Sequence, residues 1–162
     1  MLVNNIIIKV LEYMEKPEII AAICAGDALE GDDAKEVAAY IDCLNSIRNE
    51  IACEYIPNVK LEKVKVSNKR VDYSSLKHSV IEILSVKDGF GRAIKFDAFC
   101  DHILVDGVSE VEIRYNATPE KIDFNDEFSS TIPERVYAYG ILREYYYIQT
   151  LYDDALIWDV RF

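Results

Sequence analysis

Histidine is scarce in this sequence, and the cysteines do not form the pairs that commonly bind metals. His78 and His102 are the only histidines, and the four cysteines include no C-x-x-C motif. Cys100 and His102 lie two positions apart and could share one face of a strand, but no second pair supplies the remaining ligands of a zinc site. We therefore expect no metal and no cofactor, and we expect the four thiols to stay reduced.

Catalytic motifs are missing as well. No serine lies in a G-x-S-x-G sequence, and Gly89-x-Gly91 leads into a predicted strand instead of the helix N-terminus that a phosphate site requires. The acids of residues 27–33 do not alternate as they do in a calcium-binding EF-hand loop. Nothing selects one carboxylate pair for glycoside chemistry among the 29 acidic residues. An enzyme is therefore the least favoured class of function.

The sequence also has no long hydrophobic run. No apolar stretch reaches the roughly 18 residues that are needed to span a bilayer, and Ile6–Ile8 is far shorter. No charged and then apolar leader precedes these isoleucines, so we expect synthesis in the cytosol and no membrane partner. The 162 residues are 51% hydrophobic, which is enough for one globular domain with a substantial core.

Basic residues are few in comparison with acidic ones, and the imbalance is uneven along the chain. The net charge is −11, from 18 Lys and Arg against 29 Asp and Glu. Residues 1–56 carry four basic and eleven acidic side chains, residues 119–162 carry four and nine, and the stretch between them is nearly neutral. Such a surface repels a polyanion, so we expect that DNA is not bound. Solubility alone is the simplest role of this acidity.

The hydrophobic pattern of the first third predicts helices. Apolar residues recur every three or four positions over residues 3–15, 18–25 and 34–55, with Asp33 placed to cap the third helix. A strand over residues 5–10 is the competing interpretation of the first segment.

From Val59 the period changes to two, which predicts about five antiparallel strands up to residue 117. A parity slip predicts a bulge near Lys63, and Asn68-Lys69 predicts a turn. Two hairpins are expected, one around Asp88–Gly91 and one around Asp106-Gly107 that joins residues 100–105 to 109–116.

The last third returns to a helical pattern. Capping boxes at Thr131/Glu134 and at Thr150/Asp153 predict one helix after Thr131 and a shorter one from Leu151. The whole chain then forms a single α+β domain, residues 1–162. In it, an antiparallel β-sheet subdomain of about residues 59–118 is inserted into a helical layer made from residues 1–56 and 130–162.

Aromatic residues concentrate in this last third, which contains six tyrosines and one tryptophan. Tyr145, Tyr146 and Tyr147 point about 100° apart on a helix, so at least one of them must leave the core. Exposed tyrosine beside tryptophan and arginine is typical of protein interfaces, while a crowded core is the equally weighted alternative. The candidate anchors of an assembly interface are Tyr146, Tyr147, Trp158, Arg161 and Phe162.

Several stretches, taken in order, point to one family. A helix containing Leu44-Asn45 and Glu50-Ile51-Ala52-x-x-Tyr55 precedes a strand at residues 80–86 and a D-G turn. The β-block closes with V-E-I-R-Y-N-A-T-P at residues 111–119. The chain then ends with Y-G-I-L-x-E-Y from Tyr139 and A-x-x-W-x-x-x-F from Ala155. This order resembles the head-to-tail adaptor, or neck, proteins of tailed bacteriophages, including the gatekeeper-type tail proteins.

The resemblance implies a non-enzymatic structural protein of a phage or prophage, made in the bacterial cytoplasm and located in the virion neck. It would form a ring beneath the portal, with portal proteins, tail proteins and further copies of itself as partners. DNA would pass through this ring without being bound. The acidic helical layer would then face the channel, through residues 120–127 or through Asp27, Glu30, Asp32 and Asp33. The alternative function is a soluble, non-enzymatic binding module that recognises a peptide or glycan through its β-surface.

Overall fold

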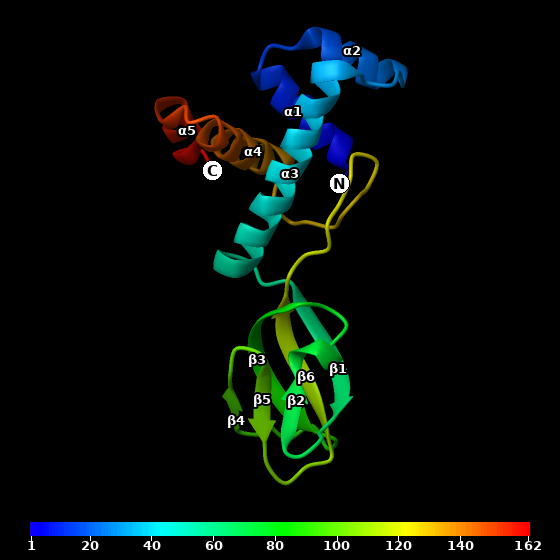
Figure 1. Cartoon of the computed structure of the whole chain (residues 1–162), viewed down its shortest axis with the longest axis vertical. Helices are drawn as coiled ribbons and strands as arrows, with labels where there is room; N and C mark the ends of the chain where they lie inside the picture. Colours follow the sequence, from blue (N-terminus) through cyan, green and yellow to red (C-terminus); the bar gives the residue numbers. More distant parts are fainter. The chain divides into compact units, whose positions relative to one another are not determined.

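The computed structural model describes all 162 residues and has the predicted α+β composition (Figure 1). The chain divides into a helical unit, Met1–Arg48 with Glu120–Phe162, and a β-unit, Asn49–Pro119. The helices are α1 (Val3–Tyr13), α2 (Pro17–Ala25), α3 (Gly31–Glu54), α4 (Glu134–Ile148) and α5 (Tyr152–Asp159). The last turns of α3 belong to the β-unit. No helix combines the length and the apolar character that crossing a membrane requires.

The helical periodicity predicted the helices better than the capping signals did. Asp33 does not cap α3 from outside, because the helix begins two residues earlier and Asp33 lies in its first turn. The predicted capping box at Thr131 and Glu134 does not form, because Pro133 is the N-cap residue of α4 and has an extended backbone. The second box is wrong too, because Leu151 precedes α5 and Thr150 adopts a left-handed φ of 61°.

Apolar stripes of α1, α3 and α4 form the core of the helical unit. The α1 helix packs against α4, and the Tyr40 ring of α3 meets the Tyr145 ring of α4 edge-on at 4.8 Å. Each large side chain buried in this way contributes about 1.5–3 kcal/mol. The fully buried members include Val3, Ile6, Ile7, Val10 and Leu11 of α1, Tyr40, Leu44 and Ile47 of α3, and Ala138, Ile141 and Leu142 of α4.

Two polar side chains of α3 hold the segment that returns from the β-unit. The side-chain amide of Asn45 donates to the Ile122 carbonyl and accepts from the Ile122 N–H, both at 3.0 Å. One turn later, the Arg48 guanidinium donates to the Glu120 carbonyl at 2.7 Å and lies 4.7 Å from the centre of the Phe128 ring. The acidic segment before α4 is therefore fixed on α3 through its backbone.

The β-unit contains six strands, and all of its strand pairs are antiparallel, as predicted. They form two three-stranded sheets instead of one, in the orders β1-β6-β3 and β2-β5-β4. Apolar residues of both sheets make one core, so the sheets pack face to face (Figure 1). The strands are β1 (Val59–Lys65), β2 (Arg70–Asp72), β3 (Val80–Asp88), β4 (Phe96–Ala98), β5 (His102–Val105) and β6 (Glu110–Ala117).

The predicted turns form, but the predicted strand pairing is partly wrong. The turn at Asp106-Gly107 joins β5 to β6, which lie in different sheets and so make no hairpin. After the turn at Asp88–Gly91 the chain makes a single bridge to β3 and then supplies β4, which pairs with β5. The expected bulge in β1 is also misplaced, since β1 pairs without interruption and the irregular register lies in β3. Turn residues mark where a chain reverses, but not which sheet it joins next.

The Asp88 side chain organises the turn after β3. One carboxylate oxygen accepts hydrogen bonds from the N–H groups of Phe90 and Arg92 at 2.9 Å, and the other accepts from the Arg92 guanidinium at 2.8 Å. Gly91 takes the left-handed φ of 81° that the reversal needs. These bonds, with those from Arg92 first, hold the pKa of Asp88 below its ordinary value of 3.8.

We expect Asp88→Asn to destabilise the β-unit at neutral pH and to weaken its acid dependence. Because the folded carboxyl has the lower pKa, its contribution is complete above the unfolded pKa of 3.8 and disappears as the pH falls through the folded value. The protein would be unfolded in urea and followed through the amide NMR signals of β3. The urea midpoint of the variant at pH 7 should be lower than that of the wild type. Equal urea midpoints at pH 7 would contradict this role for Asp88. So would a variant whose free energy of unfolding depends on pH between about pH 5 and 2 as steeply as that of the wild type.

Candidate functional site

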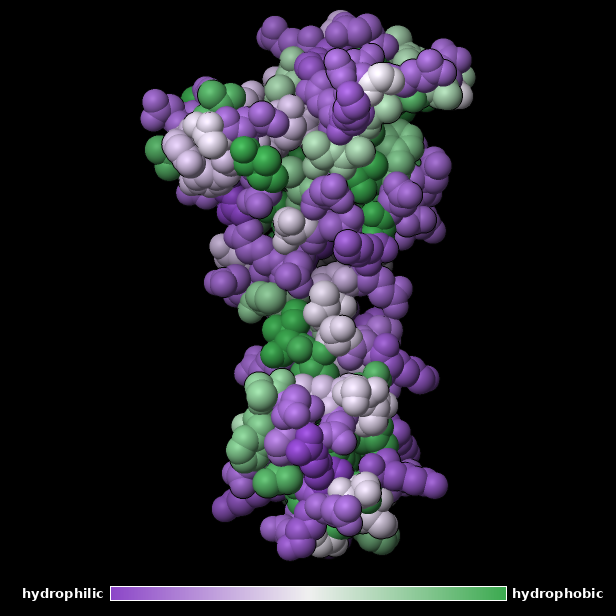
Figure 2. Space-filling model, in the orientation of Figure 1, coloured by the Kyte–Doolittle hydropathy of each residue, from purple (hydrophilic) through white to green (hydrophobic).

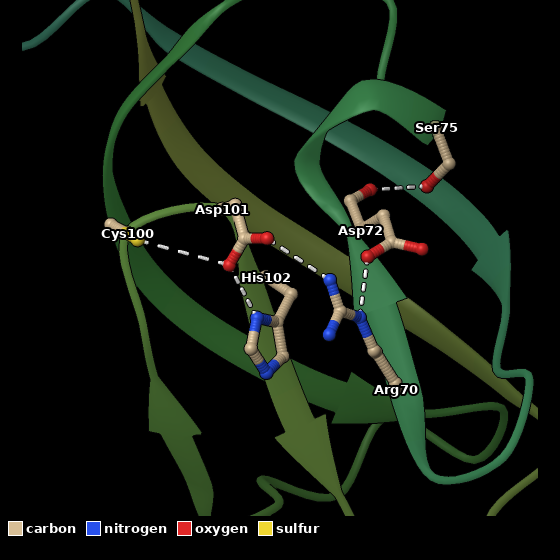
Figure 3. A network of polar contacts seen from close by, with 6 residues as sticks. All are labelled: Arg70, Asp72, Ser75, Cys100, Asp101 and His102. Atoms are coloured by element: carbon tan, nitrogen blue, oxygen red, sulfur yellow. Dashed lines mark hydrogen bonds and ion pairs between the residues drawn. The ribbon is translucent and has the colours of Figure 1, made fainter.

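The best local cluster of the sequence, Cys100-Asp101-His102, forms a polar network at one end of the sheet β2-β5-β4 (Figure 3). One Asp101 oxygen lies 2.6 Å from His102 Nδ1 and 3.9 Å from Cys100 Sγ. The other accepts a hydrogen bond from the Arg70 guanidinium at 3.1 Å. The hydrogen bond with His102, followed by the charge interactions with His102 and then with Arg70, holds the pKa of Asp101 below its ordinary value.

The polar groups of this network are paired with one another. Asp101 stands between the thiol and the imidazole, and the His102 ring is stacked on Phe99 with a centroid distance of 4.7 Å. No three His, Cys, Asp or Glu side chains of the chain come together as a metal-binding group. The polar groups bind one another and tie the beginning of β5 to β2.

The four acids predicted to face a channel lie near the start of α3. Asp27 and Glu30 are in the loop before the helix, Asp32 and Asp33 are in its first turn, and all four are exposed. Asp32 pairs with Lys35 at 2.8 Å. The fold therefore gathers these acids in one region, and their orientation in a ring stays a prediction.

The predicted interface residues divide into inward-facing and outward-facing ones. The Trp158 ring is half-buried between the rings of Tyr13 and Tyr139, at centroid distances of 5.4 and 5.8 Å. The Arg161 guanidinium covers that indole at 4.9 Å. Phe162 is half-buried under the Arg143 guanidinium, at 4.5 Å, so its contacts lie within its own chain.

The consecutive tyrosines of α4 diverge as helical geometry predicts. Tyr145 packs on Tyr40, and the Tyr146 hydroxyl donates to the Met14 sulfur at 3.2 Å. Burial raises the pKa of Tyr146. Tyr147 is exposed, and its ring lies 6.2 Å from that of Tyr152 at the start of α5.

Sequence reasoning missed most of the apolar residues that the fold leaves outside. Tyr147 belongs to a group of large side chains at the end of α4 and along α5 that we call the C-terminal apolar surface (Figures 1 and 2). Val160 is 88% exposed, and the others are between 37% and 64% exposed. The signal was a stripe at steps of four residues along α5, formed by Tyr152, Leu156 and Val160. The surface consists of Tyr147, Ile148, Leu151, Tyr152, Leu156, Ile157 and Val160.

Only small and half-buried residues attach α5 to the rest of the helical unit. Ala155 is the one fully buried residue of this helix, and Trp158 is half-buried. An ion pair between Arg143 and Asp159, at 3.5 Å, adds a polar contact. The large aliphatic side chains of α5 are therefore not needed for its attachment, and they are free to contact another molecule.

Comparison with known proteins adds no family to this geometry. No protein-family model matches the chain, and no curated protein matches it significantly. The likeness to phage adaptors therefore depends on the residues quoted above, and a function has to be argued from the surfaces of the molecule.

We expect Gly140→Ala to destabilise the helical unit although alanine favours a helix. A Cβ atom at position 140 would lie 2.9 Å from Ile47 Cγ2 and 2.9 Å from the Phe162 ring. Overpacking of this kind costs about 1–3 kcal/mol, against a gain of about 1 kcal/mol in helix propensity. Urea unfolding followed by Trp158 fluorescence should give a lower midpoint. The loss should be smaller in a Phe162→Ala background, and equal losses in both backgrounds would contradict the close approach of Phe162.

Proposed function

We propose that this protein is a non-enzymatic subunit of a phage or prophage head-to-tail adaptor, which assembles as a ring between portal and tail. The observation that carries the proposal is the C-terminal apolar surface. Soluble monomers seldom expose so many neighbouring large apolar side chains, and such patches commonly mark protein interfaces. A subunit of a permanent assembly needs a surface of this kind.

The composition of the surface favours a protein partner. Its stripe of Tyr152, Leu156 and Val160, at steps of four residues, is the pattern with which a helix occupies a groove in another protein. Arg161 stacked on Trp158 lies beside it, and both residue types are enriched at interaction hot spots. Acidic residues at the start of α5, Asp153 and Asp154, supply a polar edge.

The distribution of charge is compatible with a ring around DNA. The helical unit contains eight basic and eighteen acidic residues, whereas the β-unit contains ten and eleven. Few cations are therefore present where the helical unit would meet a duplex. Because binding to DNA depends on the release of counterions by Lys and Arg, such a surface would let the duplex slide without being held.

The alternative, a binding module that uses its β-surface, has one observation in its favour. Strand β1 is at the edge of its sheet, and its Val59 and Leu61 are 41% and 60% exposed. A peptide could add to such an edge. Lys63 and Lys65 continue along the same strand face, and lysines of this kind also protect edges from unwanted pairing.

We expect the double substitution Leu156→Asn and Val160→Asn to prevent adaptor function while leaving the fold intact. Both side chains are exposed, so the loss should be in docking and not in stability. The variant would be supplied in cells that carry the phage genome without this gene, and tailed particles would be counted by electron microscopy. Their number should fall by at least about tenfold, because apolar anchors dominate binding energy.

A matched control for this test is Phe90→Asn, another exposed apolar residue, in the turn after β3. Normal particle numbers with the α5 variant would overturn the role of the C-terminal apolar surface. Failure of the wild-type gene to restore any tailed particles would overturn the adaptor proposal itself. Point substitutions are preferred to removal of the last residues, because Trp158 and Phe162 pack within the chain.

We also expect the purified protein not to bind duplex DNA. An anisotropy titration of a labelled duplex at about 20 mM salt is the most sensitive test, because screening is weakest there. No binding should be detected below about 100 µM protein. Micromolar affinity that falls steeply with salt would show that cations of this chain contact phosphate, and would contradict an acidic channel.

A further inference from the structure

A groove runs along α3 in the helical unit and takes no part in the core. It consists of two adjoining hollows of about 430 and 360 Å³, which share Ala38 and Ile41. Ile23 of α2 and Phe124 of the segment before α4 add apolar walls to the larger hollow. Asn4 also lines it and has a buried side-chain oxygen without a hydrogen-bond partner. The groove therefore combines apolar walls with a buried oxygen that lacks a hydrogen-bond partner.

The rim of this groove is acidic. The carboxylates along it are those of Asp27, Asp42, Asp123 and Asp126, and all four residues are exposed. Lys121 is the single basic residue that lines either hollow. The hydrogen bonds that Asp123 and Asp126 accept come from backbone N–H groups, at 2.7 Å, and leave their charges uncompensated. A complementary surface would be apolar and basic.

The β-unit carries a surface of that kind on β1. The outer face of this edge strand presents Val59, Leu61, Lys63 and Lys65 in alternation. Leu61 is 60% exposed, and Arg114 of β6 lies directly opposite it in the sheet and is also exposed. The carboxylate of Glu62 points to the other face, where it binds the Tyr115 hydroxyl. The exposed Leu61 thus lies between Arg114 and Lys63, and Glu112 and Glu110 lie opposite Lys63 and Lys65 on the same face.

We propose that the outer face of β1 in one copy of the protein docks into the acidic groove along α3 of a second copy. Leu61 would enter the groove over Ala38 and Ile41, and the strand lysines would meet the carboxylates of the rim. Because the two surfaces are different, each copy uses both of them. Such head-to-tail contacts either close into a ring or extend as a filament, according to the rotation between copies.

This inference deepens the proposed ring by assigning its contact between subunits, and it does not depend on what binds α5. Charge reversal on each side provides the test. The groove variant is Asp42→Lys with Asp123→Lys, and the strand variant is Lys63→Glu with Lys65→Glu. All four positions are exposed, so circular dichroism should show unchanged folds.

Sedimentation velocity of the full chain would measure self-association at low and at high salt. The wild type should associate reversibly and more weakly at high salt, because rim charges are screened. Each variant alone should associate at least about tenfold more weakly, since its two docking surfaces have charges of the same sign. An equimolar mixture should recover association, because each variant then meets a surface of opposite sign.

Two further variants separate this contact from a general effect of charge. Ala38→Phe fills the groove without changing the charge and should weaken association by a similar factor. The matched control, Glu15→Lys with Glu18→Lys, makes the same change in charge elsewhere on the helical unit, at two exposed positions, and should associate like the wild type.

A wild type that stays monomeric at about 1 mM would overturn the proposal, as would variants that associate normally or a mixture that does not recover. The proposal would also be overturned if the control lost association while the Ala38→Phe variant kept it. That result would show that net charge, and not the groove, controls association. A monomeric wild type would not change what the particle count with the α5 variant says about the C-terminal apolar surface. Failure of this contact and failure of adaptor function are therefore distinguishable.

Discussion

The arrangement of the helical unit depends on the hydrogen bonds that Asn45 and Arg48 of α3 form with the backbone of the segment before α4. The backbone of Ile122 is satisfied by Asn45 as a neighbouring strand would satisfy it, and the Glu120 carbonyl is satisfied by Arg48. Each such bond contributes about 1 kcal/mol, and more where a charged group takes part. Burial lowers the pKa of Arg48, but a guanidinium stays protonated and keeps its donors. Further along, the same segment is held by backbone hydrogen bonds between Val3 and Asp126 and between Phe128 and Met1.

The exposed surface of α5 follows from how little of this helix is buried. Ala155 is its one buried residue, and Phe162, which follows the helix, fills the space that Gly140 of α4 leaves beside Ile47. Small residues let two elements come close, so little apolar area is needed to hold the helix. An ordinary amphipathic helix turns its largest apolar residues inward. Here the one buried residue is small, and the large apolar residues are exposed.

The sequence predicted the elements well because periodicity reflects burial, and each strand or long helix has a buried face. It failed at the starts of two helices, and it failed where distant segments decide the pairing of strands. The signals at Thr131 and Thr150 are local, but the helix starts were set by Pro133 and by the left-handed backbone of Thr150. The β5 and β6 strands looked like a hairpin, although each found its partners in a different sheet.

The candidate surfaces were predicted only in part, for the same reason. Trp158 and Phe162 are large and near the chain end, which suggested anchors for a partner, yet Tyr13, Tyr139 and Arg143 cover them. The two proposed contacts also differ in physical character. The proposed contact at the acidic groove relies on charges that salt screens beyond about 8–10 Å. Binding through the C-terminal apolar surface would instead become stronger in salts that are excluded from protein surfaces. Ionic strength would therefore separate the proposed association of copies from the proposed docking through α5.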